Sequence, residues 1–125
     1  MDFEKTVQDV CERALKIFGV RGLRFRPMRR VAKINPKKGY VIGRTSLKTG
    51  LITIDIFTPL KREEKKISSI LRTLSHEAAH HQKRPFRQIY KRHLINRQHF
   101  PEFYKQVEKN ITLLKEDKIL GQFFT

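Results

Sequence analysis

The stretch TLSHEAAHHQ at residues 73–82 combines two histidines and a glutamate in a pattern that can support metal chemistry. On a helix, side chains four residues apart lie on one face with their Cβ atoms about 5–6 Å apart, so His76 and His80 can direct two imidazole nitrogens toward one ion. Glu77 follows the first histidine, which places its carboxylate where it can take a proton from a water molecule. The spacing predicts two zinc ligands and a general base for peptide-bond hydrolysis.

A catalytic zinc site needs a third protein ligand and keeps a fourth position open. His99 stands two residues before Pro101, which is expected to begin the last helix. A side chain at such a loop-to-helix junction can swing back over the helix that carries the first two histidines. We therefore predict that His99 is the third ligand. Tyr104, in the same last helix, is a candidate to donate a hydrogen bond to the tetrahedral intermediate.

The order of these features resembles the SprT-like (Spartan-type) zinc metallopeptidases. A strand, an HExxH helix, a connecting segment and a histidine followed by Pro-Glu-Phe occur between Gly50 and Val107, about half of the chain. The resemblance implies a zincin-like fold, in which the three histidines bind zinc and Glu77 is the general base. The small scaffold also resembles the minimal gluzincins, which implies a glutamate as third ligand, at Glu102 or Glu108.

The helices that must position these residues are predicted from apolar residues that recur at steps of three and four. Phe3 to Phe18 forms one such stripe. A long helix is predicted from about Lys61 to Arg84, and it carries the HExxH motif. Pro85 ends this helix, FRQIYKRHLI is predicted as a shorter helix with its apolar side chains inward, and a last helix runs from Pro101 to Leu120.

Three segments between the first two helices alternate apolar and polar residues, which predicts strands. They are LRFRPM followed by residues 31–34, then GYVIGRTS and GLITIDIFTP, which are joined by a tight turn at LKTG. Together they predict a small three-stranded antiparallel sheet, with Pro27 at an edge or a bulge. In the last strand the isoleucines should face the core, with Thr53 and Asp55 outward. The predicted fold class is α+β, and the family resemblance implies a single zincin-like domain over residues 1–125.

A protein or peptide substrate is expected to lie along the strand at residues 51–57 as an added strand. Such pairing reads the substrate backbone more than its side chains, which predicts low sequence specificity. An enzyme of this kind needs another source of selectivity, and the charge of the chain offers one.

The charge is strongly unbalanced, because 28 lysines and arginines face 12 aspartates and glutamates, for a net charge of +16. No acidic residue occurs in residues 13–54 or 78–101. We predict that these basic spans bind DNA or another polyanion, and the SprT-like resemblance implies recruitment to DNA-bound proteins. The alternative is a solvated, solubilising surface. The candidate nucleic-acid-binding residues are Arg24, Arg26, Arg29, Arg30, Lys37, Lys38, Arg87 and Arg92.

The bulk composition predicts one soluble domain. A chain of 125 residues with 38 % hydrophobic content can bury a single modest core. No apolar run approaches the roughly 18 residues that span a bilayer, and MDFEKTVQD lacks the basic patch and apolar stretch of a signal peptide. We therefore expect a cytoplasmic protein without membrane association. Cys11, the single cysteine, lies on the apolar side of the first helix and is predicted to be buried.

Two other functions are compatible with the sequence. One is a small basic nucleic-acid-binding protein with a structural zinc site, which would need a fourth ligand such as His81, His93 or Cys11. The other is a latent minimal gluzincin whose apolar end, ILGQFFT, folds back and fills its own cleft. The substrate and the oligomeric state do not follow from the sequence.

Overall fold

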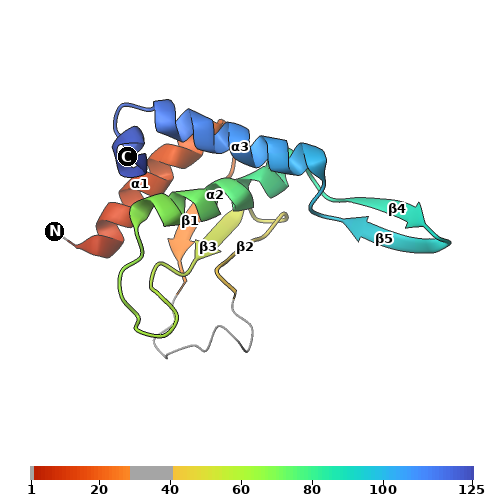
Figure 1. The fold of residues 1–125 in the computed structure, drawn as a ribbon, viewed down its shortest axis with the longest axis horizontal. Helices are drawn as coiled ribbons and strands as arrows, with labels where there is room; N and C mark the ends of the chain where they lie inside the picture. Colours follow the sequence, from red (N-terminus) through yellow and green to blue (C-terminus); the bar gives the residue numbers. More distant parts are fainter. Residues whose placement is uncertain (1, 29–40) are drawn as a thin grey trace.

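The computed structural model describes residues 2–28 and 41–125. In Figure 1 the helices lie over one side of a small sheet, and a two-stranded hairpin projects from one end of the molecule. In chain order the elements are α1 (Phe3–Phe18), β1 (Arg24–Pro27), β2 (Gly43–Thr45), β3 (Leu51–Ile54), α2 (Ile67–Gln82), β4 (Phe86–Tyr90), β5 (His93–Arg97), α3 (Pro101–Glu116) and the 3-10 helix η2 (Leu120–Phe124).

Helix α1 has the predicted bounds, and its ends show why. The side chain of Asp2 accepts a hydrogen bond from the backbone N–H of Glu4, which caps the first turn. Gly19 has a φ of 73°, the left-handed conformation that closes a helix at low cost. The buried stripe of α1 includes Cys11, which is fully buried as predicted, and burial raises the pKa of its thiol far above the ordinary range. This thiol is therefore an inert part of the core.

The three-stranded sheet is mixed, so the prediction of an antiparallel sheet was wrong in part. The strand order is β1-β3-β2, with β2 antiparallel and β1 parallel to β3. β3 is the central strand, because β1 pairs with one of its edges and β2 with the other, and its last three residues are buried. At the tight start of β3, Gly50 has a φ of 78°, and a Cβ there would lie 2.2 Å from the carbonyl oxygen of Gly22. Residues 31–34, predicted as part of the first strand, lie outside the described residues.

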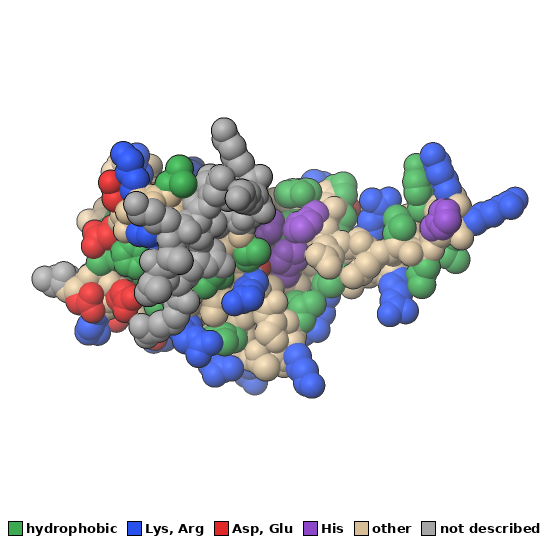
Figure 2. All heavy atoms as spheres, turned by 90° about the horizontal axis from the view of Figure 1, so that it is seen from below, with side chains coloured by type: hydrophobic (Ala, Val, Ile, Leu, Met, Phe, Trp, Pro, Cys, Tyr) green, Lys and Arg blue, Asp and Glu red, His purple; other side chains and the backbone are tan. Residues whose placement is uncertain are grey.

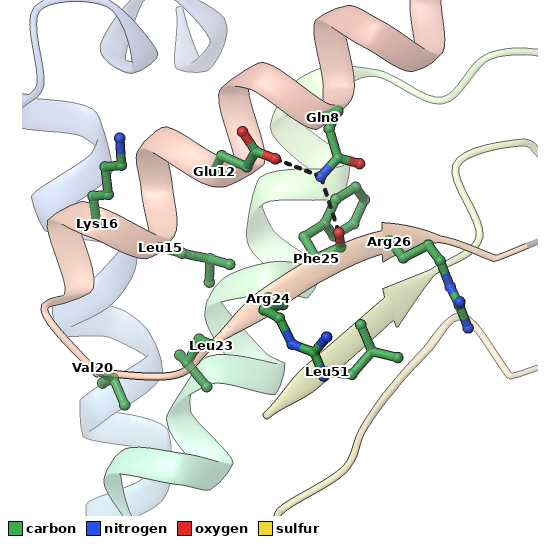
Figure 3. A pocket seen from close by; sticks show the side chains of 10 residues that line it. All are labelled: Gln8, Glu12, Leu15, Lys16, Val20, Leu23, Arg24, Phe25, Arg26 and Leu51. Carbon is green, nitrogen blue, oxygen red and sulfur yellow. Dashed lines mark hydrogen bonds between the residues drawn. The ribbon is translucent and has the colours of Figure 1, made fainter. Parts of the chain in front are cut away.

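The outer edge of β1 is closed to further strand pairing. The side-chain amide of Gln8 donates to the carbonyl oxygen of Phe25 at 3.0 Å and to the carboxylate of Glu12 at 2.9 Å (Figure 3). Pro27, the last residue of β1, has no N–H to offer, in agreement with its predicted place at an edge. Among the described residues, no strand pairs with the opposite edge of the sheet, which β2 forms.

Asp55 is fully buried, although the alternation of β3 predicted that it points outward. Its carboxylate forms a two-point ion pair with the guanidinium of Arg62, at 2.9 and 3.0 Å, and accepts the N–H of Phe57 at 3.2 Å. The Lys65 ammonium donates to the backbone oxygen of Asp55 at 2.8 Å. Burial alone would raise the pKa of Asp55, but the hydrogen bonds and positive charges of these partners outweigh it and lower the pKa.

This ion pair explains why α2 begins at Ile67 and not near Lys61 as predicted. Arg62 has a φ of 51° and turns back toward Asp55, so the segment between β3 and α2 forms a loop. The backbone N–H of Lys65 bonds to the oxygen of Ile56 within that loop. Arg62 and Lys65 have high helix propensity, but their positive charges pair with the buried Asp55, and this interaction holds them in a loop.

We expect Asp55→Asn to destabilise the protein by about 3 kcal/mol near neutral pH, because it leaves the mostly buried Arg62 charge unpaired. The folded-state pKa of Asp55 is depressed, so its contribution is present above the unfolded pKa of about 4 and is lost as the pH falls through the folded value. Urea unfolding of wild type and variant should therefore converge in strong acid. Asp9→Asn, which removes an exposed pair with Lys5, should cost less than about 1 kcal/mol. If the free energies of unfolding of wild type and Asp55→Asn differ by the same amount at all pH values, this account is wrong.

The predicted helix at FRQIYKRHLI is instead the β4–β5 hairpin, which was the largest error in the fold prediction. Its strands pair from Phe86 with Arg97 to Tyr90 with His93, around a two-residue turn at Lys91 and Arg92. Both turn residues have positive φ values, 50° and 68°, a conformation that Asn-Gly usually supplies. The apolar side chains predicted to point inward are exposed: Phe86, Ile89, Tyr90 and Leu94.

Helix α3 begins at Pro101 as predicted but ends at Glu116, and the chain then turns into η2. Leu120 is fully buried, and the Phe124 ring lies 5.4 Å from the guanidinium carbon of Arg72. Figure 1 places this end of the chain at the end of α2 opposite the hairpin. The tail packs against the start of α2. The latent alternative required the tail to fill the cleft beside the HExxH motif, and no residue of the described tail lines that cleft.

Among the described residues, no helix is both long and apolar enough to cross a lipid bilayer. The core is formed by apolar side chains from α1, the sheet, α2, α3 and η2. Its members are Val7, Val10, Cys11, Ala14, Leu15, Phe18, Phe25, Ile52, Ile54, Ile56, Ile70, Leu71, Leu74, Ala78, Leu114 and Leu120.

Candidate metal centre

Three imidazole rings meet beside the C-terminal half of α2. His76 and His80 lie one turn apart on the helix, with ring centroids 5.1 Å apart. His99 lies 5.3 Å from the first ring and 4.9 Å from the second. One nitrogen from each ring lies within 4.8 Å of the other two. The structure therefore brings together the three histidines that the sequence predicted as ligands.

His99 reaches this position because α3 is tied to α2. The chain leaves α2, forms the hairpin and returns directly before α3, with His99 at the junction. Asn110 of α3 is fully buried, and its amide donates to the backbone oxygen of Ser75 at 3.1 Å and to the side chain of Gln82 at 2.7 Å. Its own oxygen accepts from Gln106 at 3.0 Å. This network fixes the two helices that carry the histidines relative to each other.

Phe103 supports all three rings, a role that the sequence prediction missed. It is fully buried in the first turn of α3, and its ring stacks on His80 at 4.5 Å with an interplanar angle of 27°. It contacts His76 at 5.0 Å and His99 at 5.1 Å through edge contacts. A buried apolar ring in contact with all three imidazoles limits their rotation. The sequence signal that could have predicted this role of Phe103 is the Pro-Glu-Phe stretch shortly after His99.

The donor set fits a zinc ion. Three imidazole nitrogens that converge in this way suit zinc and leave a fourth position open. Burial lowers the pKa of His80 to about 4, with a further contribution from the neighbouring histidines, and it also lowers the pKa of His76. Both rings are neutral near pH 7, so their lone pairs are available to a metal.

Glu77 lies next to these histidines without belonging to the ligand group. Its side chain is buried, with 8 % of the residue exposed, and burial raises the pKa of its carboxyl group to about 7. With the three histidines it lines a cavity of about 410 Å³. A carboxylate with a pKa near neutrality, in a cavity beside a metal site, has the properties of a general base.

The edge strand β2 lines the same cavity, whereas β3, predicted to pair with the substrate, has no free edge. β3 cannot take an added strand because it is paired on both sides. The N–H of Asp55 donates to the oxygen of Ile42, and the N–H of Ser46 donates to the oxygen of Leu51. By alternation, the backbone groups of Gly43 and Thr45 between them point outward from the sheet. In the described part of the chain, no strand pairs with this edge.

Two contacts set β2 close to α2. A Cβ on Gly43 would lie 2.9 Å from the side-chain methyl of Thr73, so glycine permits this approach. A hydrogen bond joins the hydroxyl of Thr45 to the ring of His81. A second hollow of about 460 Å³ shares Gly43, His76 and Glu77 with the first and continues past Val41 and Ile42. A groove thus follows the β2 edge on both sides of the histidines.

The two alternative ligands lie apart from the three histidines, whereas the predicted stabiliser contacts one of them. Glu102 is exposed and faces a group of lysines in a separate hollow, and Glu108 is exposed further along α3. Neither belongs to the group that could hold a metal ion. Tyr104 is 54 % exposed, and its ring stacks on His99 at 6.2 Å with an interplanar angle of 28°. Its role toward an intermediate stays a prediction.

The predicted nucleic-acid-binding residues do not form one surface in the described structure. Arg24 and Arg26 are exposed on β1, beside the groove that β1 forms with α1 (Figure 3). Arg87 and Arg92 belong to the projecting hairpin (Figure 1). The other four, Arg29, Arg30, Lys37 and Lys38, lie outside the described residues. DNA binding therefore stays a prediction that rests on charge.

Comparisons with known proteins give one structural similarity. No protein-family model matches the chain, and no curated protein matches it significantly. The SprT-like family therefore stays a prediction. The solved structure found is the crystal structure of the metallopeptidase zymogen of Pyrococcus abyssi abylysin, with a TM-score of 0.48 and 24 % sequence identity over 94 % of this chain and 87 % of that one.

Proposed function

We propose that this protein is a zinc-dependent endopeptidase of the HExxH type. The observation that carries the proposal is the convergence of three imidazoles within 4.8 Å beside a buried glutamate, at a strand edge that no other strand of the described residues pairs with. His76, His80 and His99 would hold the zinc ion. When bound, zinc supplies a Lewis acid that polarises a peptide carbonyl group and makes a water molecule more acidic.

The β2 edge binds the substrate in this proposal. An extended polypeptide can pair with the outward backbone groups of Gly43 and Thr45, which sets the peptide bond across the histidines. The hydrogen bond between Thr45 and His81 holds this edge at a fixed distance from α2. Because backbone groups make most of these contacts, the enzyme should accept many sequences.

Glu77 moves the proton. Its carboxylate takes a proton from the attacking water and passes it to the nitrogen of the leaving amine. Its burial keeps bulk water away from the transfer and brings its pKa close to working pH. Phe103 and the Asn110 network hold the imidazoles still during this exchange.

A structural zinc site is the alternative, and the geometry disfavours it. Such a site is closed by four protein ligands. Among the described residues, the candidate metal group contains three. Of the possible fourth ligands, His81 is bonded to Thr45, Cys11 is buried in α1, and His93 lies in the hairpin.

The test of the proposed function is cleavage of an unfolded polypeptide. Purified protein supplied with zinc should release new fragments with free amino termini, detected by mass spectrometry. A chelator should stop the release, and added zinc should restore it, because a base alone does not activate the carbonyl group. Equal cleavage with and without the chelator would point to a contaminating enzyme. No cleavage of any unfolded polypeptide by zinc-loaded protein would overturn the proposal.

A further inference from the structure

The β4–β5 hairpin is an arm attached at both ends to the metal centre. Pro85, just before β4, and Gln98, just after β5, line the cavity of the histidines. The Phe86 ring packs against Phe100 at 5.0 Å, which anchors the base of the arm. Beyond this base, β4 and β5 contact mainly each other among the described elements. The hairpin projects from the body of the protein in Figures 1 and 2.

The two faces of the arm differ. On one face, Arg97 lies over the ring of Tyr90 at 5.9 Å and donates to the side chain of Gln88 at 2.9 Å, so these side chains form contacts among themselves. On the other face, the pair Ile89 and Leu94 is 76 % and 63 % exposed. A two-stranded hairpin is marginally stable in water by itself, so an open apolar face of this kind indicates a partner.

Basic side chains border that apolar pair. Arg87 shares the face with Ile89, since residues two apart on a strand point the same way, and Arg92 stands at the turn next to Leu94. No acidic residue occurs in residues 78–101. The turn itself holds Lys91 and Arg92 at positive φ, a costly conformation for both, which keeps two charges at the tip. The face therefore combines an apolar centre with a positive border.

We propose that the face formed by Arg87, Ile89, Arg92 and Leu94 captures acidic segments of unfolded polypeptides and delivers them to the metal centre. This inference rests on the proposed function, since delivery has a purpose only if the site cuts polypeptides. An unfolded acidic segment supplies carboxylates for the arginines and apolar side chains for the Ile89–Leu94 pair. Its backbone can also pair with the outer edges of the hairpin, because no other strand pairs with them in the described part of the chain.

A polypeptide fits this face better than a nucleic acid does. Phosphates would satisfy the arginines, but a nucleic acid offers two exposed aliphatic side chains little contact unless they wedge between bases. The attachment of the arm at the cavity that Glu77 lines also favours a ligand that this site can process.

Binding can be measured without cleavage by using the Glu77→Gln protein. Two fluorescent peptides of equal length should be compared, which share their apolar residues and carry either Glu or Gln at the remaining positions. The Glu peptide should bind at least about tenfold more tightly than the Gln peptide, and added salt should weaken the binding of the Glu peptide. Arg87→Gln with Arg92→Gln should remove that tenfold preference, and Ile89→Ser with Leu94→Ser should weaken both peptides.

The matched control is Arg24→Gln with Arg26→Gln on β1, which removes the same charge from the body of the protein. Circular dichroism should show that all variants fold. If the hairpin and control pairs lose affinity equally, overall charge is responsible and the proposal is overturned. If a DNA oligonucleotide binds the hairpin more tightly than the acidic peptide, the partner is a nucleic acid and the proposal is likewise overturned.

The same variants separate this inference from the proposed function. In the active protein, the Arg87→Gln and Arg92→Gln pair should raise KM for a long acidic polypeptide and leave kcat for a short neutral peptide unchanged. Cleavage with normal KM in this variant would overturn the docking role while the peptidase function stands. If the protein binds the acidic peptide selectively but cuts no polypeptide, the hairpin still binds acidic segments, and the proposed delivery to a peptidase site is overturned.

Discussion

Replacing His76 or His80 with alanine should reduce zinc affinity by far more than 100-fold. Loss of a partner that only orients a ligand already costs about 10–100-fold, and here a ligand itself is lost from a three-residue set. The measurement is competition with a chromogenic chelator of known affinity. His93→Ala is the matched control, because His93 lies exposed in the hairpin. Wild-type affinity in both helix variants would place the metal elsewhere.

The third ligand is tested in the same assay. His99→Ala should lose zinc as the helix variants do, whereas Glu102→Ala should retain it, since Glu102 faces lysines in a separate hollow. The circular dichroism spectrum should show that α3 is intact in both. If Glu102→Ala were the variant that lost zinc, the ligand set would be that of the minimal gluzincins, and α3 would have to rotate on metal binding.

The parts of the site that could be predicted from the sequence are those set by local geometry. The positions of His76, Glu77 and His80 follow from the pitch of one helix, and α2 retains that pitch from Ile67 onward. His99 was predicted as a ligand from its place before the proline that starts α3, and the contact of Asn110 with α2 helps to set His99 beside the other two histidines. No sequence pattern predicts such a contact, because it joins residues far apart in the chain.

The errors arose where tertiary partners override local preference. The segment at 61–66 has helix-forming residues, but the buried carboxylate of Asp55 holds Arg62 in the loop. The hairpin turn was missed because Lys91 and Arg92 take the positive φ values that Asn-Gly usually provides. The mixed sheet was missed because a parallel β1–β3 pair leaves no signal in the sequence between the strands. Because of that last error, the substrate was expected along a strand that the structure shows to be paired on both sides.

Glu77→Gln should lower peptidase activity by a factor on the order of 100 or more, because the substitution keeps the side-chain volume and removes the base. Zinc affinity should survive, since Glu77 is outside the ligand group. Binding of the acidic peptide to the hairpin should survive as well. The readout is the single-turnover rate on an unfolded polypeptide at saturating enzyme, with zinc content measured on the same sample.

The stability of the metal-free protein gives an independent check on the same residue. Burial raises the pKa of Glu77 from its unfolded value of about 4 to about 7, so the folded state binds an extra proton in that interval. This group therefore makes wild type lose stability as the pH rises from about 4 to about 7. In thermal unfolding with a chelator present, Glu77→Gln should lack this loss and exceed wild type above neutral pH. A variant that is inactive but also unfolded or zinc-free would show that Glu77 holds the site together, and a variant as active as wild type would remove Glu77 from the chemistry.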